Sequence, residues 1–136
     1  MRDNVFFDSN LWVYLYSDTN KCSIVIDLSN KHFDNIVIST QVLGECFNVL
    51  TRKKIKTSEL AQEIIEDIAS ASDVAGIDKQ SVIKAIKIHT SYKYSYYDSL
   101  IIASALENNG AILYTEDMHN QQVIEGSLKI VNPFVS

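Results

Sequence analysis

Short runs of apolar residues recur along the chain, separated by longer segments whose apolar residues have helical spacing. Each short run is apolar throughout, which is typical of a strand buried on both faces of a parallel sheet. The run at 36–38 is also β-branched at every position, which favours a strand. The pattern predicts five strands, at residues 5–7, 36–38, 74–77, 111–114 and 128–131.

Six intervening segments are predicted to be amphipathic helices. Most of them begin next to a Ser, Thr or Asp whose side chain can cap the free N–H groups of a first turn. The last one ends at Asn109-Gly110, a pair typical of helix C-termini. The predicted helices cover residues 9–16, 20–29, 40–50, 57–69, 78–89 and 95–109.

The alternation of strands and helices predicts an α/β protein. We expect a three-layer α/β/α sandwich with a central, mostly parallel five-stranded sheet, formed by residues 1–136 as a single domain. In such folds ligands bind beyond the carboxyl ends of the strands. Functional side chains are therefore expected at that edge of the sheet.

Composition narrows the class of protein further. Gly and Pro together number only five, which excludes collagen and low-complexity chains. No apolar run reaches the roughly 18 residues of a membrane span, and the first residues lack the features of a signal peptide, so we expect a cytoplasmic location. Cys22 and Cys46 are too few for a disulfide scaffold and are interpreted as buried thiols.

The net charge of −5 argues against a protein that binds nucleic acid by charge alone. The charge is unevenly distributed, with −3 over residues 1–51, +2 over 52–93 and −4 over 94–136. This distribution is either ordinary surface variation or the sign of a carboxylate cluster, built from the two ends of the chain and bordered by cations from the middle.

Four carboxylates fall where the carboxyl edge of the sheet is expected. Asp8 ends the first strand, and Asp117 follows the fourth within three residues. Glu45 lies about one and a half turns into the helix after the second strand. Asp98 lies in the first turn of the last helix, and the residues three, four and seven positions after it are apolar. A carboxylate on an apolar stripe is costly unless it is paired or binds a metal ion.

Each of the four also has an ordinary structural explanation. Asp8 can cap the following helix, and Ser95 and Asp98 fit a capping box. Asp117 can lie in a turn, and Glu45 can lie on the solvated flank of its helix. Together, however, four carboxylates at one edge repel each other unless divalent cations neutralise them. Such metal sites activate water and offset charge on a phosphoryl oxygen. The pattern therefore indicates metal-dependent phosphoryl chemistry.

Four ordered segments resemble the motifs of the PIN domain family. They are residues 5–10 (VFFDSN), 41–47 (QVLGECF), 97–103 (YDSLIIA) and 114–117 (YTED). The end of the chain, residues 123–134, is similar to bacterial members of the family of the VapC type. The one small departure is Ser99, which stands where many relatives have Ala. The resemblance spans essentially the whole chain.

The resemblance implies an α/β/α sandwich and a Mg²⁺- or Mn²⁺-dependent ribonuclease that cuts RNA in line, leaving a 5′-phosphate and a 3′-hydroxyl. It also implies a small antitoxin partner, and we expect a homodimer. By motif matching, the catalytic and metal-binding acids are Asp8, Glu45, Asp98 and Asp117, supported by the polar residues Asn10 and Thr115, with Glu116 expected to be peripheral.

Two further clusters have alternative interpretations. The basic run Arg52, Lys53, Lys54 and Lys56 is either a solvated helix end or a patch that contacts RNA phosphates. Four tyrosines interleaved with Lys93 between residues 92 and 97 either stack on bases or pack in the core or a dimer interface. The three histidines lack zinc-site spacing.

Three other functions compete with a toxin ribonuclease. A catalytically silent PIN module that binds RNA or protein would be expected to lose acids, and this chain keeps all four. An aspartyl phosphotransferase that uses Asp8 as nucleophile would need a second Asp nearby, which the segment 8–10 lacks. A ribonuclease for RNA processing, without toxicity, has the same site residues and differs in gene context.

Overall fold

The chain folds around a sheet whose strands are mostly parallel. The computed structural model describes residues 3–135. The strand order is β3-β2-β1-β4-β6-β5, and every neighbouring pair is parallel except β5 and β6. The strands are β1 Asn4–Phe7, β2 Ile36–Ser39, β3 Asp73–Ala75, β4 Gly110–Tyr114, β5 Val123–Ile124 and β6 Leu128–Val131. The predicted α/β class and the mostly parallel sheet are confirmed.

The predicted number of strands is wrong, because the described residues form six strands instead of five. The additional strand, β5, has only two residues and pairs antiparallel with β6, with Ile124 opposite Leu128. Glu125 and Gly126 make the tight connection with positive φ angles of 51° and 71°. One of the two β5 side chains, Val123, is half exposed at 50%. A strand this short leaves no apolar run in the sequence.

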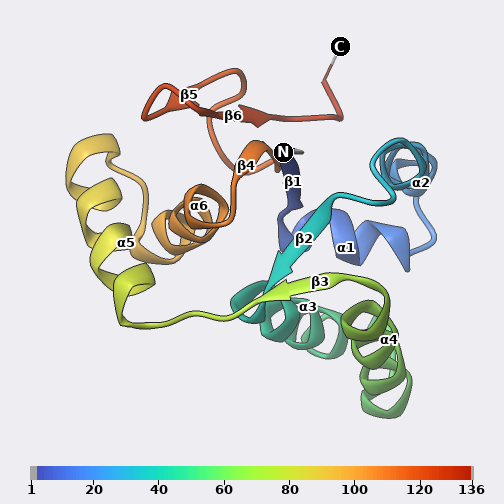
Figure 1. Cartoon of the computed structure of the whole chain (residues 1–136). Helices are drawn as coiled ribbons and strands as arrows, with labels where there is room; N and C mark the ends of the chain where they lie inside the picture. Colours follow the sequence, from blue (N-terminus) through green and yellow to red (C-terminus); the bar gives the residue numbers. More distant parts are fainter. Residues whose placement is uncertain (1–2, 136) are drawn as a thin grey trace.

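The helices lie on two sides of the sheet (Figure 1), with α5 and α6 packed together on one side and α3 packed against α1 and α4 on the other. The helices of residues 3–135 are α1 Ser9–Leu15, α2 Lys21–Lys31, α3 Thr40–Arg52, α4 Ser58–Ala71, α5 Lys79–Tyr92 and α6 Tyr96–Glu107. The last helix ends before the predicted Asn109-Gly110 pair. Asn109 itself takes the left-handed conformation, with φ 60°.

The central strands and helix α6 share one hydrophobic core. Phe7 of β1, Leu113 of β4 and Ile102 of α6 are almost fully buried in one hydrophobic core. Gly110 allows the chain to turn from α6 into β4, because a Cβ atom there would lie 2.7 Å from the carbonyl oxygen of Ala105. This close approach places the beginning of β4 beside β1, and thereby the ends of both strands at one edge.

Two smaller features complete the description. Cys46 is buried, as predicted, but the prediction for Cys22 is wrong because its side chain is only half-buried. Cys22 is the second residue of α2, and its thiol donates a hydrogen bond to the carbonyl of Leu15 at 3.5 Å. Within residues 3–135 no helix is long and apolar enough to cross a membrane.

Candidate active site at the carboxyl edge of the sheet

Asp8 lies between β1 and α1 and is 3% exposed. It is itself the N-cap of α1, because its Oδ1 accepts a hydrogen bond from the N–H of Ser9 at 2.6 Å. Its Oδ2 accepts one from the hydroxyl of Thr115, at the end of β4, at 2.8 Å. Burial raises the pKa of Asp8 to about 6, against these two hydrogen bonds, and the charges of Glu45 and Asp98 raise it further.

Glu45 lies on α3 and faces the same edge. Its Oε2 accepts a hydrogen bond from Nε2 of Gln41, one turn earlier, at 3.1 Å, and the same nitrogen also donates to the carbonyl of Tyr97 at 3.1 Å. Burial is the main cause of a raised Glu45 pKa, to which the charge of Asp98 contributes. Gln41 therefore connects the helix that carries Glu45 with the helix that carries Asp98.

Asp98 lies in the first turn of α6, whose N-cap is Ser95. The hydroxyl of Ser95 accepts a hydrogen bond from the backbone N–H of Asp98 at 3.1 Å, which is one half of a capping box. Burial raises the pKa of Asp98, and the charge of Asp117 raises it further, while a hydrogen bond with the Ser95 side chain opposes both effects. The charge of Asp117 therefore affects the pKa of Asp98, although Asp98 also belongs to the first turn of α6.

Asp117 is exposed and follows β4 in a loop. Its Oδ2 accepts a hydrogen bond from Nδ2 of Asn10 at 2.9 Å, and its backbone N–H donates to the Thr115 hydroxyl at 3.2 Å. Thr115 therefore contacts two of the four acids, since the same hydroxyl donates to Asp8. Both supporting residues named by the motifs, Asn10 and Thr115, lie where they orient carboxylates.

All four carboxylates line one cavity of about 310 Å³. Among the described residues that line it, Arg52 is the only Lys or Arg. None of the ion pairs found within residues 3–135 involves Asp8, Glu45, Asp98 or Asp117. The carboxyl edge of the sheet is therefore a concentration of negative charge that the chain itself leaves largely uncompensated.

The donor set fits a hard divalent cation, since it consists of carboxylate oxygens without a thiolate or an imidazole. Burial is the main cause of the raised pKa values of Asp8, Glu45 and Asp98, and the charge of at least one neighbouring acid raises each of them further. Over the described part of the chain, however, no three acidic, His or Cys side chains are close enough to ligate a single ion. The four carboxylates share the cavity, but no three of them form such a ligand group.

Glu116 points away from the four acids, toward α1 and α2. It pairs with Nζ of Lys21 at 2.8 Å and accepts a short hydrogen bond from the hydroxyl of Tyr14. Despite partial burial, these bonds lower the pKa of Glu116. Lys21 also lies over the rings of Tyr14 and Phe134, at 4.8 and 5.0 Å from their centroids. The charge of Glu116 is therefore compensated within the chain.

The basic run divides between three cavities. Arg52 lines the cavity of the four acids. Lys53 lines an adjacent cavity, while Lys54 and Lys56 line a third one beside Thr57 at the beginning of α4. The run is thus not a single patch.

The tyrosine cluster is also divided. Tyr94 is buried, and its hydroxyl accepts a hydrogen bond from the N–H of His119 at 3.1 Å and donates to Gln122. The hydroxyl of Tyr92 accepts one from the N–H of Glu125 at 3.0 Å. Tyr97 is 66% exposed. The motifs gave no role to Gln41 or Tyr94, although the spacing of four residues between Gln41 and Glu45 on a helix is a signal for their pairing.

Comparison with known proteins shows the family and the fold of the chain. The family model of the PIN domain matches residues 5–124, so the chain belongs to the PIN domain family. The resemblance seen in the four motifs is thereby confirmed. Among curated protein sequences, none matches the chain at a significant level.

Several solved structures share the fold. VapC20 of Mycobacterium tuberculosis, described as a toxin that cleaves the sarcin-ricin loop, has a TM-score of 0.71 at 18% identity, over 84% of this chain and 90% of its own. A toxin–antitoxin complex from Klebsiella pneumoniae has a TM-score of 0.74 at 17% identity, over 96% and 98%. DNA-bound VapBC from Salmonella typhimurium has a TM-score of 0.72 at 19% identity, over 95% of this chain and 98% of its own.

Proposed function

We propose that this protein is a divalent-metal-dependent endoribonuclease that hydrolyses RNA phosphodiester bonds. The observation that carries the proposal is the common cavity of Asp8, Glu45, Asp98 and Asp117, which come from four separate segments of the chain. Membership of the PIN domain family supports it. A passive binding module would have no need of four acids that repel each other, three of them buried or half-buried.

The four carboxylates would hold Mg²⁺ or Mn²⁺, which when bound offsets charge on the phosphoryl oxygens and makes a water more acidic. The chain's own residues orient these acids. Each supporting side chain donates a hydrogen bond to a carboxylate: Thr115 to Asp8, Asn10 to Asp117, and Gln41 to Glu45. Arg52, on the wall of the same cavity, is placed to bind a phosphate of the RNA strand.

The decisive experiment incubates the purified protein with a pool of cellular RNAs in Mg²⁺, in Mn²⁺ and in EDTA, and maps the cut ends. We expect cleavage in either metal, with 5′-phosphate ends, and none in EDTA. Glu45→Gln should lower the rate at least about a hundredfold, since it removes one acid of the metal set. Glu63→Gln, an exposed acid of α4, serves as the matched control. Cleavage in EDTA, or an active Glu45→Gln variant, would contradict the proposal.

We further propose that the nuclease is the toxin of a toxin–antitoxin pair, acts in the cytoplasm and forms a homodimer. Similar folds occur in the toxin–antitoxin complex from Klebsiella pneumoniae and in DNA-bound VapBC. Induced expression should arrest growth of a bacterial host, and the Glu45→Gln variant should not. Growth unaffected by an active enzyme would instead favour an RNA-processing role. A monomer in light scattering at all concentrations would contradict the dimer.

A further inference from the structure

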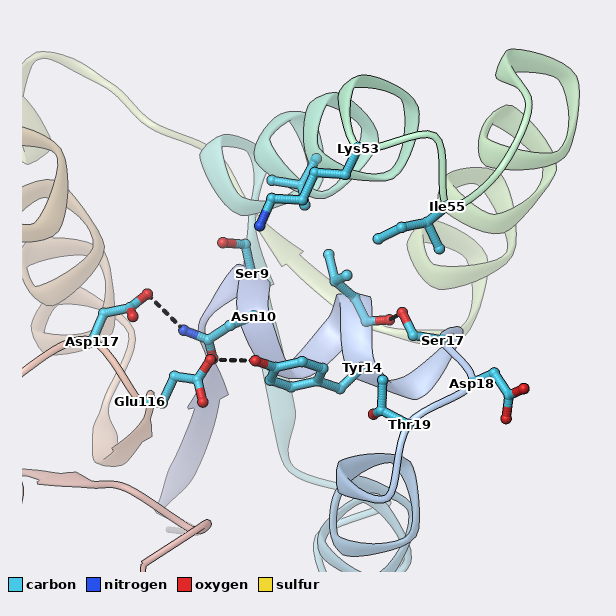
Figure 2. A pocket seen from close by; sticks show the side chains of 12 residues that line it. Ser9, Asn10, Tyr14, Ser17, Asp18, Thr19, Lys53, Ile55, Glu116 and Asp117 are labelled. Carbon is cyan, nitrogen blue, oxygen red and sulfur yellow. Dashed lines mark hydrogen bonds between the residues drawn. The ribbon is translucent and has the colours of Figure 1, made fainter.

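A second cavity, of about 470 Å³, adjoins the one that holds the four acids. Ser9, Val49 and Asp117 line both, so the two cavities are adjacent at the carboxyl edge of the sheet. The second cavity lies between α1 and the segment after α3 (Figure 2). Its position suits a ligand that also reaches the acids.

One wall of this cavity is apolar. Val13 of α1, Val49 of α3 and Ile55 in the connection to α4 all line it. Ile55 keeps 36% of its surface exposed, whereas Val13 at the base of the wall is only 6% exposed. These three side chains form a surface suited to a flat, weakly polar group such as a nucleobase or the face of a ribose.

The remaining walls carry one available cation and one available acceptor. Lys53 extends from the end of α3 toward Ser9 (Figure 2), and within residues 3–135 its ammonium makes no hydrogen bond or ion pair. Glu116, on the opposite wall, forms its ion pair with Lys21, and the charge of Lys53 makes only a smaller contribution to its lowered pKa. The Oδ1 atom of Asn10 is buried without a hydrogen-bond partner in the described part of the chain. A ligand with a phosphate for Lys53 and a hydroxyl for Asn10 would satisfy both groups.

We propose that this cavity binds one nucleotide of the RNA strand, next to the phosphodiester bond that is cleaved. Its base or sugar lies against Val13, Val49 and Ile55, and its phosphate contacts Lys53. The inference rests on the proposed ribonuclease function, because an RNA strand bound at the acids would pass the adjacent cavity, which shares three lining residues with theirs. The position beside the acids favours RNA over an acidic peptide, whose carboxylate would pair with Lys53 equally well.

Photo-crosslinking in EDTA tests this assignment without any cleavage. The probe is a random-sequence RNA decamer that contains 4-thiouridine, with binding measured by fluorescence anisotropy and crosslinks located by mass spectrometry. We expect crosslinks on the segments around Tyr14 and Ile55. Lys53→Ala should weaken binding about fivefold or more, the scale of one lost charge-assisted contact. Ile55→Trp, which fills the cavity, should abolish the crosslink at Tyr14.

Two matched variants serve as controls. Ile24→Trp adds the same side chain at a position of α2 with the same 36% exposure, and Lys79→Ala removes a cation from the beginning of α5. Both should bind RNA like the unchanged protein. If the unchanged protein cleaves RNA but Ile55→Trp and Lys53→Ala bind and crosslink like their controls, this inference is wrong and the ribonuclease function stands. If Ile55→Trp loses only the binding of a protein partner, the cavity is a peptide site and the inference is also wrong. Absence of cleavage by the unchanged protein, with crosslinks retained, would instead overturn the proposed function.

Discussion

The hydroxyl of Thr115 donates a hydrogen bond to Oδ2 of Asp8 at 2.8 Å, which ties the end of β4 to the end of β1. We expect Thr115→Val, which keeps the shape but removes the hydroxyl, to leave the buried carboxylate short of one bond. The cost should be about 1–3 kcal/mol of unfolding free energy, together with weaker Mn²⁺ binding by calorimetry. Thr115→Ser retains the hydroxyl and should keep the metal affinity. Equal affinities for the Val and Ser variants would contradict this role.

The raised pKa of Asp8, about 6 in the folded chain against 3.8 for a free side chain, predicts an unusual pH dependence. The folded state binds this proton more tightly than the unfolded state, so protonation stabilises the fold. In EDTA, stability should therefore increase as the pH falls through 6 toward 4, by about 3 kcal/mol for Asp8 alone. The raised pKa values of Glu45 and Asp98 act in the same direction, and the lowered one of Glu116 opposes them.

Thermal unfolding at pH 7.5 and 5.0 measures this effect. The Asp8→Asn variant, which has no proton to bind at that position, should show a flatter profile. Saturating Mn²⁺ should reverse the trend in the unchanged protein, because the cation binds the ionised carboxylates and dissociates as they become protonated. A metal-free protein that loses stability steadily from pH 7.5 to 5.0 would contradict the prediction.

Asp98→Asn separates a metal ligand from a helix cap. If Asp98 binds the cation, the variant should lose RNA cleavage and bind Mn²⁺ more weakly, while its stability in EDTA stays equal or increases because a repulsive charge is gone. If Asp98 serves only the helix start with Ser95, activity should survive and stability should fall by about 0.5–2 kcal/mol. Activity and melting temperature therefore move in opposite directions under the two hypotheses, and an active variant that melts earlier would overturn the assignment.

The division of the basic run predicts unequal contributions to RNA binding. Replacing Arg52 and Lys53 by Ala should lower the slope of log K against log salt by about 1.4, if each contacts one phosphate of a single strand. The same replacement at Lys54 and Lys56, which line a separate cavity, should leave the slope nearly unchanged. Equal effects of the two pairs would restore the interpretation of the whole run as one patch.

Tyr94→Phe tests whether the tyrosine cluster positions the loop after Asp117. The variant keeps the ring beside His119, whose centroid lies 5.5 Å away, but loses the hydrogen bonds with His119 and Gln122. We expect a loss of roughly 1 kcal/mol and faster amide exchange over residues 118–122. Tyr97→Phe, whose ring is 66% exposed, is the matched control. Unchanged exchange in Tyr94→Phe would show that the loop is held by other contacts.

Several elements were predictable because their signals are local. The run at 36–38 is β-branched throughout, Val37 and Ile38 are buried, and the run is a strand in the structure. Asp78 caps α5 as predicted, with a complete capping box to Ser81. In contrast, β5 exists only because Leu128 offers a partner for Ile124. Pairing of this kind is set by the neighbouring strand, and a two-residue segment carries no periodicity of its own.

For the candidate site, the sequence by itself determined which carboxylates are available and that parallel strands direct two of them, Asp8 and Asp117, to one edge. Only the tertiary structure decided what surrounds them. In the folded chain Arg52 lines the cavity of the acids, whereas Lys54 lines a different cavity. Glu116 forms an ion pair with Lys21. Adjacent residues of a chain point in different directions, and the direction of each is decided by how distant elements pack. Local pattern therefore identifies the acids, whereas their compensation, pKa and neighbouring cavity depend on contacts across more than a hundred residues, such as that between Asp8 and Thr115.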